Sequence, residues 1–357
     1  MSKILLISLG LCCLAQGQTP AALAWKFAVS GDSRNCGDVV MPAIAKGAQQ
    51  NSAEFYWHLG DFRAIYAFDE DMAPPPQLAL PPKPLSVSTY LISAWPDFIA
   101  HQMSPFGATP VFLGIGNHET ILPATREAWL LQFADWLENP LIRAQRLKDN
   151  PQDHKLHAYY HWVNRNVDFI TLDNASPDQI DDAQLAWLRS VVQRDEASPE
   201  IRTIVAGMHI PLPGNVGHVH SMSDWAQGDK SGRQVYDALW HARNAAQKQV
   251  YILASHSHFV MENVFETADW KGKVLPGWIV GTAGAVRYRL PAETGPAQKA
   301  QTDVYGFLLG SVAPDGAISF SYQKLSLDNL MEANAGKYPE ALVRWCYEEN
   351  KQLQPLR

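Results

Sequence analysis

Residues 110–119 read Pro-Val-Phe-Leu-Gly-Ile-Gly-Asn-His-Glu, an apolar run that ends in amide, imidazole and carboxylate side chains. A short continuous apolar run of this kind is typical of a strand buried on both faces of its sheet. Four other segments repeat the plan, and they are 26–32, 54–61, 201–209 and 249–258. The sequence therefore predicts five buried strands, each of which ends in side chains that bind cations or move protons.

Helices are expected between these strands, and the clearest covers 177–194. Ser176 and Gln179 fit a capping box, which would start this helix. Further strands are expected late in the chain, at 278–280, 307–309 and 318–322. Alternating strands and helices followed by strands predict α/β layers whose sheets are completed by antiparallel strands.

The composition limits the class of protein. The 357 residues are 46% hydrophobic and 18% charged, which suits a large packed core and excludes a disordered chain. The formal net charge of -7 argues against nucleic acid as a bulk partner. No apolar run reaches the roughly 18 residues that a membrane-spanning helix needs, so we expect no stable membrane span.

The first residues resemble an export signal. Lys3 precedes an apolar stretch that ends at Leu14, and Ala15-Gln16-Gly17 offers small residues for cleavage. The sequence thus predicts a signal peptide over 1–17 and a secreted or periplasmic protein, with a buried N-terminal strand or helix as the alternative.

The mature chain, 18–357, is expected to form a single domain with a core at about 26–323 and a helical tail over 324–357. Its two cysteines, Cys36 and Cys346, could pair in an oxidising compartment, although two cysteines do not establish a bond. The Pro-rich segment 73–85 and the loop 211–232 leave strand ends, where binding loops usually lie; inert surface loops are equally favoured.

The strand ends together offer a set of metal ligands. The candidates are Asp32, Asp61, Asn117, His209, His256 and His258. Carboxylate and imidazole groups suit Zn, Fe or Mn. Two such ions about 3.5–4 Å apart clamp a phosphoryl group and activate water, so the set points to a two-metal hydrolase.

The blocks resemble those of the calcineurin-like metallophosphoesterase family, which includes purple acid phosphatases and phosphodiesterases. The family blocks GDxH, GDxx, GNHE, a lone His after a strand and GHxH correspond to Gly31-Asp32-Ser33-Arg34, Gly60-Asp61-Phe62-Arg63, Gly116-Asn117-His118-Glu119, Gly207-Met208-His209 and Ser255-His256-Ser257-His258. The resemblance covers roughly 26–323. It implies two mixed β-sheets packed as a sandwich flanked by helices, and a phosphoesterase that hydrolyses a small-molecule phosphate ester by metal-activated hydroxide.

The resemblance also implies roles for single residues. Asp61 would bridge two divalent or trivalent ions, Fe, Zn or Mn. Asp32 and His258 would hold the first ion, and Asn117, His209 and His256 the second. His118, with a pKa near neutrality, would donate a proton to the leaving group or steady the phosphate. Glu119 would orient His118 or a ligand.

The chain departs from the family at Arg34, where the family usually has a ligand histidine. A guanidinium cannot ligate a cation. Either the first ion is held by fewer protein ligands, or Arg34 grips a phosphate oxygen and takes a catalytic part. Purple acid phosphatases instead use a Tyr that corresponds here to Ala64, and Tyr66 is a poor match. The alternative function is therefore a metal-poor, catalytically weakened protein that binds a phosphate ligand.

Three further residues are candidate substrate contacts. Arg63 could bind phosphate or pair with a nearby carboxylate. His218 and His220 lie on the loop after His209, where a solvated position is the alternative. His58 precedes Gly60-Asp61 inside a strand and is expected in the core. Phosphomonoesters, diesters, nucleotides, lipids and phosphoproteins all remain open as substrates, as does the oligomeric state.

Overall fold

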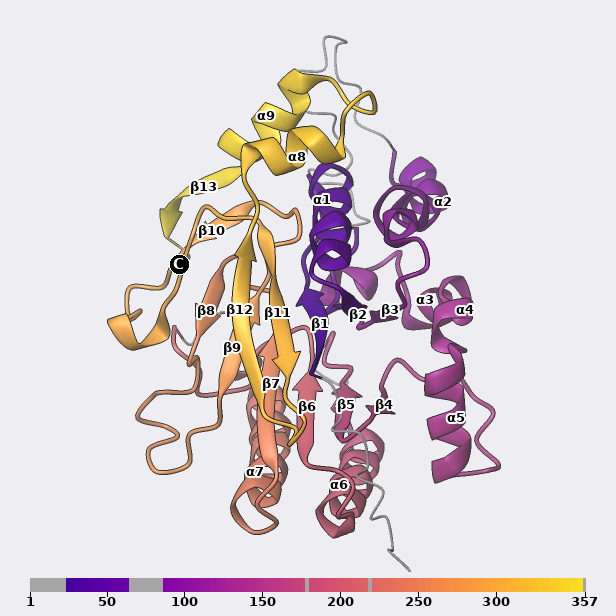
Figure 1. Cartoon of the computed structure of the whole chain (residues 1–357), viewed down its shortest axis with the longest axis vertical. Coiled ribbons are helices and arrows are strands. Elements are labelled where there is room, and N and C mark those ends of the chain that lie inside the picture. Colours follow the sequence, from indigo (N-terminus) through magenta and orange to yellow (C-terminus); the bar gives the residue numbers. More distant parts are fainter. Residues whose placement is uncertain (1–23, 64–85, 177–179, 218–219, 356–357) are drawn as a thin grey trace, which may run out of the picture.

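The computed structural model describes residues 24–63, 86–176, 180–217 and 220–355 (Figure 1). The signal peptide expected at 1–17, the Pro-rich segment 73–85 and His218 lie outside the described residues. Two large mixed sheets face each other, with helices against their outer faces. The sandwich expected from the sequence resemblance is confirmed.

The first sheet has the strand order β12-β11-β1-β2-β3. Its strands are β1 (Trp25–Ser30), β2 (Ala53–His58), β3 (Val111–Leu113), β11 (Gly306–Val312) and β12 (Ile318–Lys324). Strands β1, β2 and β3 run parallel, and β11 pairs antiparallel with β1. Helix α1 (Gly37–Gln50) packs against β2 and β11. The late strands predicted at 307–309 and 318–322 thus complete this sheet at one side.

The second sheet has the order β4-β5-β6-β7-β9-β8. Its strands are β4 (Tyr160–Asn164), β5 (Val167–Thr171), β6 (Thr203–Gly207), β7 (Gln249–Ala254), β8 (Val260–Glu262) and β9 (Gly277–Val280). Helices α6 (Asp182–Ala197) and α7 (Ala226–Asn244) share a buried apolar cluster with this sheet. Helix α6 starts later than expected, because Asp181 caps it by accepting a hydrogen bond from the Gln184 N–H.

Aromatic side chains fill the space between the two sheets. Phe112 of the first sheet stacks on Trp162 of the second with ring centroids 3.9 Å apart. Phe27 and Phe55 meet Phe169 edge-on at 5.0 and 5.1 Å. Such pairs add to the hydrophobic gain of burying large rings. Because side chains alternate along a strand, this packing fixes which residues leave each strand toward the functional edge.

The remaining elements surround the sandwich. They are α2 (Val87–Phe98), η2 (Ile99–Met103), η3 (Ser104–Phe106), η4 (Asn117–Glu119), α3 (Arg126–Gln132), α4 (Ala134–Leu137), α5 (Pro140–Asp149), η5 (Met222–Asp224), β10 (Arg287–Arg289), η6 (Pro296–Gln298), α8 (Leu327–Ala333), α9 (Glu340–Glu348) and β13 (Lys351–Pro355). The tail expected to be helical contains α8 and α9, but its last described residues form β13, which pairs with β10. A disulfide between Cys36 and Cys346 joins the start of α1 to α9.

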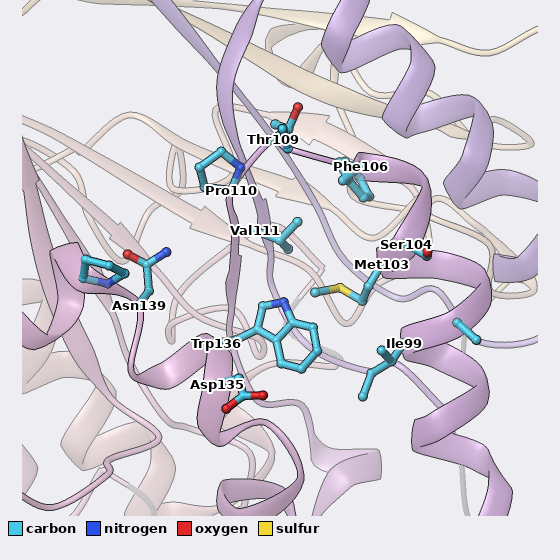
Figure 2. Close-up of a pocket in the computed structure, with 14 residues that line it drawn as sticks. Ile99, Met103, Ser104, Phe106, Thr109, Pro110, Val111, Asp135, Trp136 and Asn139 are labelled. Atoms are coloured by element: carbon cyan, nitrogen blue, oxygen red, sulfur yellow. The ribbon is translucent and has the colours of Figure 1, made fainter.

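A cavity of about 630 Å³ opens at the start of β3 (Figure 2). Trp136, Met103 and Asn139 are among the residues that line it. Val111 marks the end of β3 that lies away from Asn117, so this cavity is separate from the side chains discussed below. Within the described part of the chain, no helix is both long and apolar enough to cross a membrane.

Candidate metal centre

The candidate ligands gather where five strands end. Asp32 follows β1, Asp61 follows β2, Asn117 follows β3, His209 follows β6 and His256 follows β7. Hydrogen bonds cross between the two sheets at this edge. The His256 N–H donates to Oδ2 of Asp32 at 2.7 Å, and Nδ1 of His209 lies 3.0 Å from the carbonyl oxygen of Leu59. The edge is therefore one connected site to which both sheets contribute.

Three of these residues have an unusual backbone conformation. Asp32, Asp61 and His256 have φ values of 61°, 59° and 67°. The left-handed region is sparsely populated by residues other than glycine, and such strain concentrates at functional sites. The turns also leave no room to spare: a Cβ on Gly116 would lie 2.2 Å from Oδ1 of Asp61. Sharp turns thus aim these side chains into one small volume.

Three side-chain atoms that can accept hydrogen bonds converge on Nε2 of His209. Its Nε2 lies 2.9 Å from Oδ1 of Asn117, 3.1 Å from Nδ1 of His256 and 3.3 Å from Oδ1 of Asp61. Its Nδ1 faces the Leu59 carbonyl and the Ser255 hydroxyl, both at 3.0 Å. Since the carbonyl can only accept, Nδ1 carries a proton, and Nε2 is the nitrogen that faces the cluster and offers a lone pair in the neutral ring. Ser255, where the family has glycine, thus contacts a candidate ligand.

The carboxylates of the site favour a cation beside them. Burial opposes ionisation, yet His209 and His118 hold the pKa of Asp61 well below its ordinary value. Burial likewise opposes the charged form of His209, but the carboxylates of Asp61 and Asp32 raise its pKa to about 9. A proton on His209 answers the same electrostatic demand as a metal ion. The ligand atoms of Asp61, His209 and His256 all lie within 4.8 Å of one another, so these residues fit a metal ion.

Asp32 and His258 form the second half of the cluster. Oδ1 of Asp32 is buried, accepts no hydrogen bond from the described residues, and lies 3.3 Å from Nε2 of His258. The Nδ1 of His258 donates to the Val286 carbonyl at 2.7 Å, which leaves a lone pair on Nε2. A buried carboxylate oxygen that faces an imidazole lone pair also fits a cation. His258 is held from one side by Tyr288, whose ring stacks on it at 3.9 Å.

Glu119 fixes the backbone of the site. Its carboxylate accepts hydrogen bonds from the N–H groups of Asp61, Phe62 and Gly116 at 2.8–2.9 Å. Burial and the nearby Asp61 carboxylate raise the pKa of Glu119 to about 7. Of the two roles expected for Glu119, its contacts match orientation of a ligand, because they hold the turn that carries Asp61.

Arg34 lies inside the cluster. Its Nη1 is 3.3 Å from Nδ1 of His118, and its Nε is 3.9 Å from Oδ2 of Asp61. A guanidinium only donates, so Nδ1 of His118 accepts and its proton belongs on Nε2. Burial, together with the Arg34 charge, lowers the pKa of His118 to about 4. A pKa near neutrality was expected from the sequence, and the difference arises from the burial of His118 and from Arg34 beside it.

The other predicted residues take different positions. Arg63 is buried, and its Nη2 pairs with Asp38 at 2.5 Å. Of the two roles expected for Arg63, this contact matches pairing with a nearby carboxylate. The ring of His220 lies 5.2 Å from that of His256 and 5.7 Å from that of Tyr288, so it belongs to the site. His58 is fully buried and meets the Ser33 hydroxyl at 3.0 Å.

Sequence reasoning missed two residues of the site, Tyr288 and Asn35. Tyr288 lies on β10, a three-residue strand that has no apolar pattern. Asn35 follows the first block directly, but its side chain contacts Val286, which is 251 positions away. The contact between Asn35 and Val286 has no signal in the sequence.

No protein-family model and no curated protein sequence matches the chain. Solved structures do resemble it. Purple acid phosphatase PPD1 from yellow lupin (Lupinus luteus) gives a TM-score of 0.52 at 14% identity, over 85% of this chain and 52% of that one. PhoD gives 0.51 at 16% identity, over 86% and 73%. GAP50, the anchor in the inner membrane complex of Plasmodium, gives 0.50 at 11% identity, over 89% and 96%.

The chain spans about half the length of the lupin phosphatase chain that it matches. At these identities the similarity concerns the fold. The two mixed sheets and the helices that flank them agree with the resemblance found in the sequence. The chain is thus a protein of the metallophosphoesterase fold.

Proposed function

We propose that the chain is an exported, metal-dependent phosphoesterase that hydrolyses a small-molecule phosphate ester. The observation that carries the proposal is the convergence of Asn117, Asp61 and His256 on the Nε2 lone pair of His209 within 3.3 Å. Acceptors gathered on one ring nitrogen fit a cation, which is a proton on His209 in the metal-free chain and would be a metal ion in the loaded site. One structural neighbour, the lupin protein, is named a purple acid phosphatase, which supports the same class of reaction.

The ligand roles follow from the placement of the side chains. Asp61 lies between the two halves of the cluster and would bridge them. Asp32 and His258 would hold one ion, and Asn117, His209 and His256 the other. Fe, Zn or Mn suits this donor set. When bound, such ions would hold phosphate oxygens and lower the pKa of a bound water.

His118 and Arg34 would act on the substrate together. Because Arg34 donates to Nδ1 of His118, the donor of the neutral ring is its Nε2–H. A pKa of about 4 keeps His118 neutral at pH 7. A neutral ring whose Nδ1 is already an acceptor serves as a hydrogen-bond donor to a phosphate oxygen rather than as a source of a proton. Of the two roles expected for His118, we therefore favour steadying the phosphate.

Export is supported by the disulfide between Cys36 and Cys346. Disulfides persist in secreted and periplasmic proteins and are rare in reducing compartments. The predicted signal peptide would direct the chain there. Mature protein from an exporting host should begin after residue 17, and protein that begins at Met1 would contradict export.

The alternative function is binding of a phosphate ligand at a metal-poor site without turnover. Arg34 would then replace part of the positive charge that metal ions supply. GAP50, which has the same fold, is described as an anchor. We favour the enzyme, because Asp61, His209 and His256 bring their ligand atoms together despite the substitution at position 34.

The test combines elemental analysis with a substrate panel. The exported protein is analysed for Fe, Zn and Mn, and then assayed on chromogenic phosphomonoesters and phosphodiesters with each metal. Substitution of a supporting residue of a metal site typically costs 10–100-fold, so Asp61→Ala and Asn117→Ala should each lower turnover by at least ~100-fold. Asp237→Ala, on the exposed face of α7, is the control. Unchanged turnover in both site variants would exclude the mechanism, whereas bound phosphate without metal or turnover would favour the alternative.

A further inference from the structure

The loop after β9 and the turn after β1 run side by side next to the candidate metal centre. Three backbone hydrogen bonds join them: Ala283 N–H to Gly31 O at 3.0 Å, Ala285 N–H to Asp32 O at 2.9 Å, and Cys36 N–H to Gly284 O at 3.1 Å. A fourth bond uses a side chain, because Oδ1 of Asn35 accepts from the Val286 N–H at 3.0 Å. Asn35 thus completes a ladder whose other members are backbone groups.

The backbone of Val286 in turn contacts a candidate ligand through its carbonyl. Its carbonyl oxygen accepts the hydrogen bond from Nδ1 of His258 at 2.7 Å. This contact keeps the ring proton on Nδ1 and directs the Nε2 lone pair toward Asp32, 3.3 Å away. The N–H and the carbonyl of Val286 belong to successive peptide units that share its Cα, so a hold on the N–H restricts the carbonyl through the φ and ψ angles of this residue. The backbone conformation of Val286 therefore decides which nitrogen of His258 faces the cluster.

The backbone that follows Val286 is held through Arg287 by a segment late in the chain. Arg287 is buried, and its guanidinium donates to the carbonyl oxygens of Tyr347 at 2.7 Å and Asn350 at 3.1 Å. A cation at these last carbonyls also suits the C-terminus of α9. With Arg287 fixed in this way, Asn35 provides the hold on the Val286 N–H.

We propose that Asn35 is a positioning residue of the candidate metal centre: its side-chain oxygen holds the N–H of Val286 and so restricts the backbone of this residue, whose carbonyl holds His258 with Nε2 directed at Asp32. The effect on metal binding rests on the proposed function. The orientation of the His258 ring is a property of the metal-free chain, so the two can be tested separately.

The structure supplies matched variants. Asn35 has φ 57°, so Asn35→Gly keeps the backbone conformation and removes only the acceptor. Asn35→Asp keeps an acceptor oxygen at the same place. Asn263 provides the control, because it has φ 58° and its side chain also bonds to a backbone group: its Nδ2 donates to the Ala297 carbonyl. It follows β8 at the end remote from His258, and Asn263→Gly should leave the site unchanged.

The main readout is the tautomer of His258 in metal-free protein, from the ¹⁵N shifts of its ring, assigned by comparison with His258→Gln. The native chain, Asn35→Asp and Asn263→Gly should carry the proton on Nδ1, whereas Asn35→Gly should show a mixture of both tautomers. In a titration with Mn²⁺, Asn35→Gly should lose ~10–100-fold in affinity for one ion, the loss typical of a supporting residue. Thermal unfolding checks that each variant is folded.

A folded Asn35→Gly protein with the same His258 tautomer as Asn263→Gly would overturn the proposal, even if the native chain binds Mn²⁺. If the native chain binds no metal ion, the proposed function fails. A tautomer mixture confined to Asn35→Gly would in that case still establish the positioning role.

Discussion

Arg34→Met separates the charge of Arg34 from its bulk, and it should raise the pKa of His118. Methionine fills similar space without a charge. In the native chain, Nη1 of Arg34 lies 3.3 Å from Nδ1 of His118, and the pKa of His118 is lowered to about 4 by burial and then by Arg34. Removing the cation removes the repulsion that Arg34 exerts on a protonated ring.

The size of the change follows from Coulomb's law. Two unit charges at this distance repel by ~1 kcal/mol in water and ~5 kcal/mol at an effective dielectric constant of 20. One pKa unit corresponds to ~1.4 kcal/mol. Burial is the larger cause and remains in the variant, so the pKa should stay below the ordinary value. We therefore expect a rise of ~1–2 units.

The assay is an NMR titration of the His118 ring in metal-free protein, with the signal assigned by its absence in His118→Gln. Arg34→Lys is the matched control, because it keeps the charge while it loses the planar guanidinium. Its His118 should titrate close to the native value. A His118 pKa in Arg34→Met equal to that in Arg34→Lys would refute the electrostatic role of Arg34 at this site.

Three further predictions concern the metal centre and stability. Arg34→His should raise the affinity for the ion held by Asp32 and His258 if Arg34 stands in place of a ligand; an unchanged metal stoichiometry by elemental analysis would contradict this account. Burial opposes the charged form of His161, but Asp168 and Asp149 raise its pKa to about 10, so its contribution to stability is complete below pH ~6.5 and is lost as the pH rises through 10. Thermal unfolding should show that loss in the native chain, whereas His161→Gln should be less stable by ~3–5 kcal/mol at pH 6 and lack the same pH dependence. Cys346→Ser opens a disulfide that spans 310 positions and should cost ~2–5 kcal/mol in denaturant unfolding, and a variant as stable as the native chain would show that the bond does not form.

The sequence predicted the positions of the site well, because strand ends are a local property. Each block joins an apolar run to a polar cluster, and parallel strands deliver their carboxyl ends to one edge of a sheet. Asp61 and His209 lie 148 positions apart, yet both follow a strand of this kind, and their side chains meet at 3.3 Å. The hairpin of β4 and β5 was not singled out from the sequence, although Asp173 and Asn174 follow β5.

The chemistry of single groups was harder to predict than their location, because it depends on contacts between distant segments. An isolated histidine titrates near neutrality, so a pKa of about 4 for His118 could not be predicted from the sequence. That value arises from burial beside Arg34, which is 84 positions away. Arg34 removes a metal ligand at position 34, because a guanidinium cannot bind a metal ion. The same contact selects the His118 tautomer that presents Nε2–H. A substitution that removes one ligand can therefore leave the geometry of the site intact while it changes which groups carry charge and which donate hydrogen bonds.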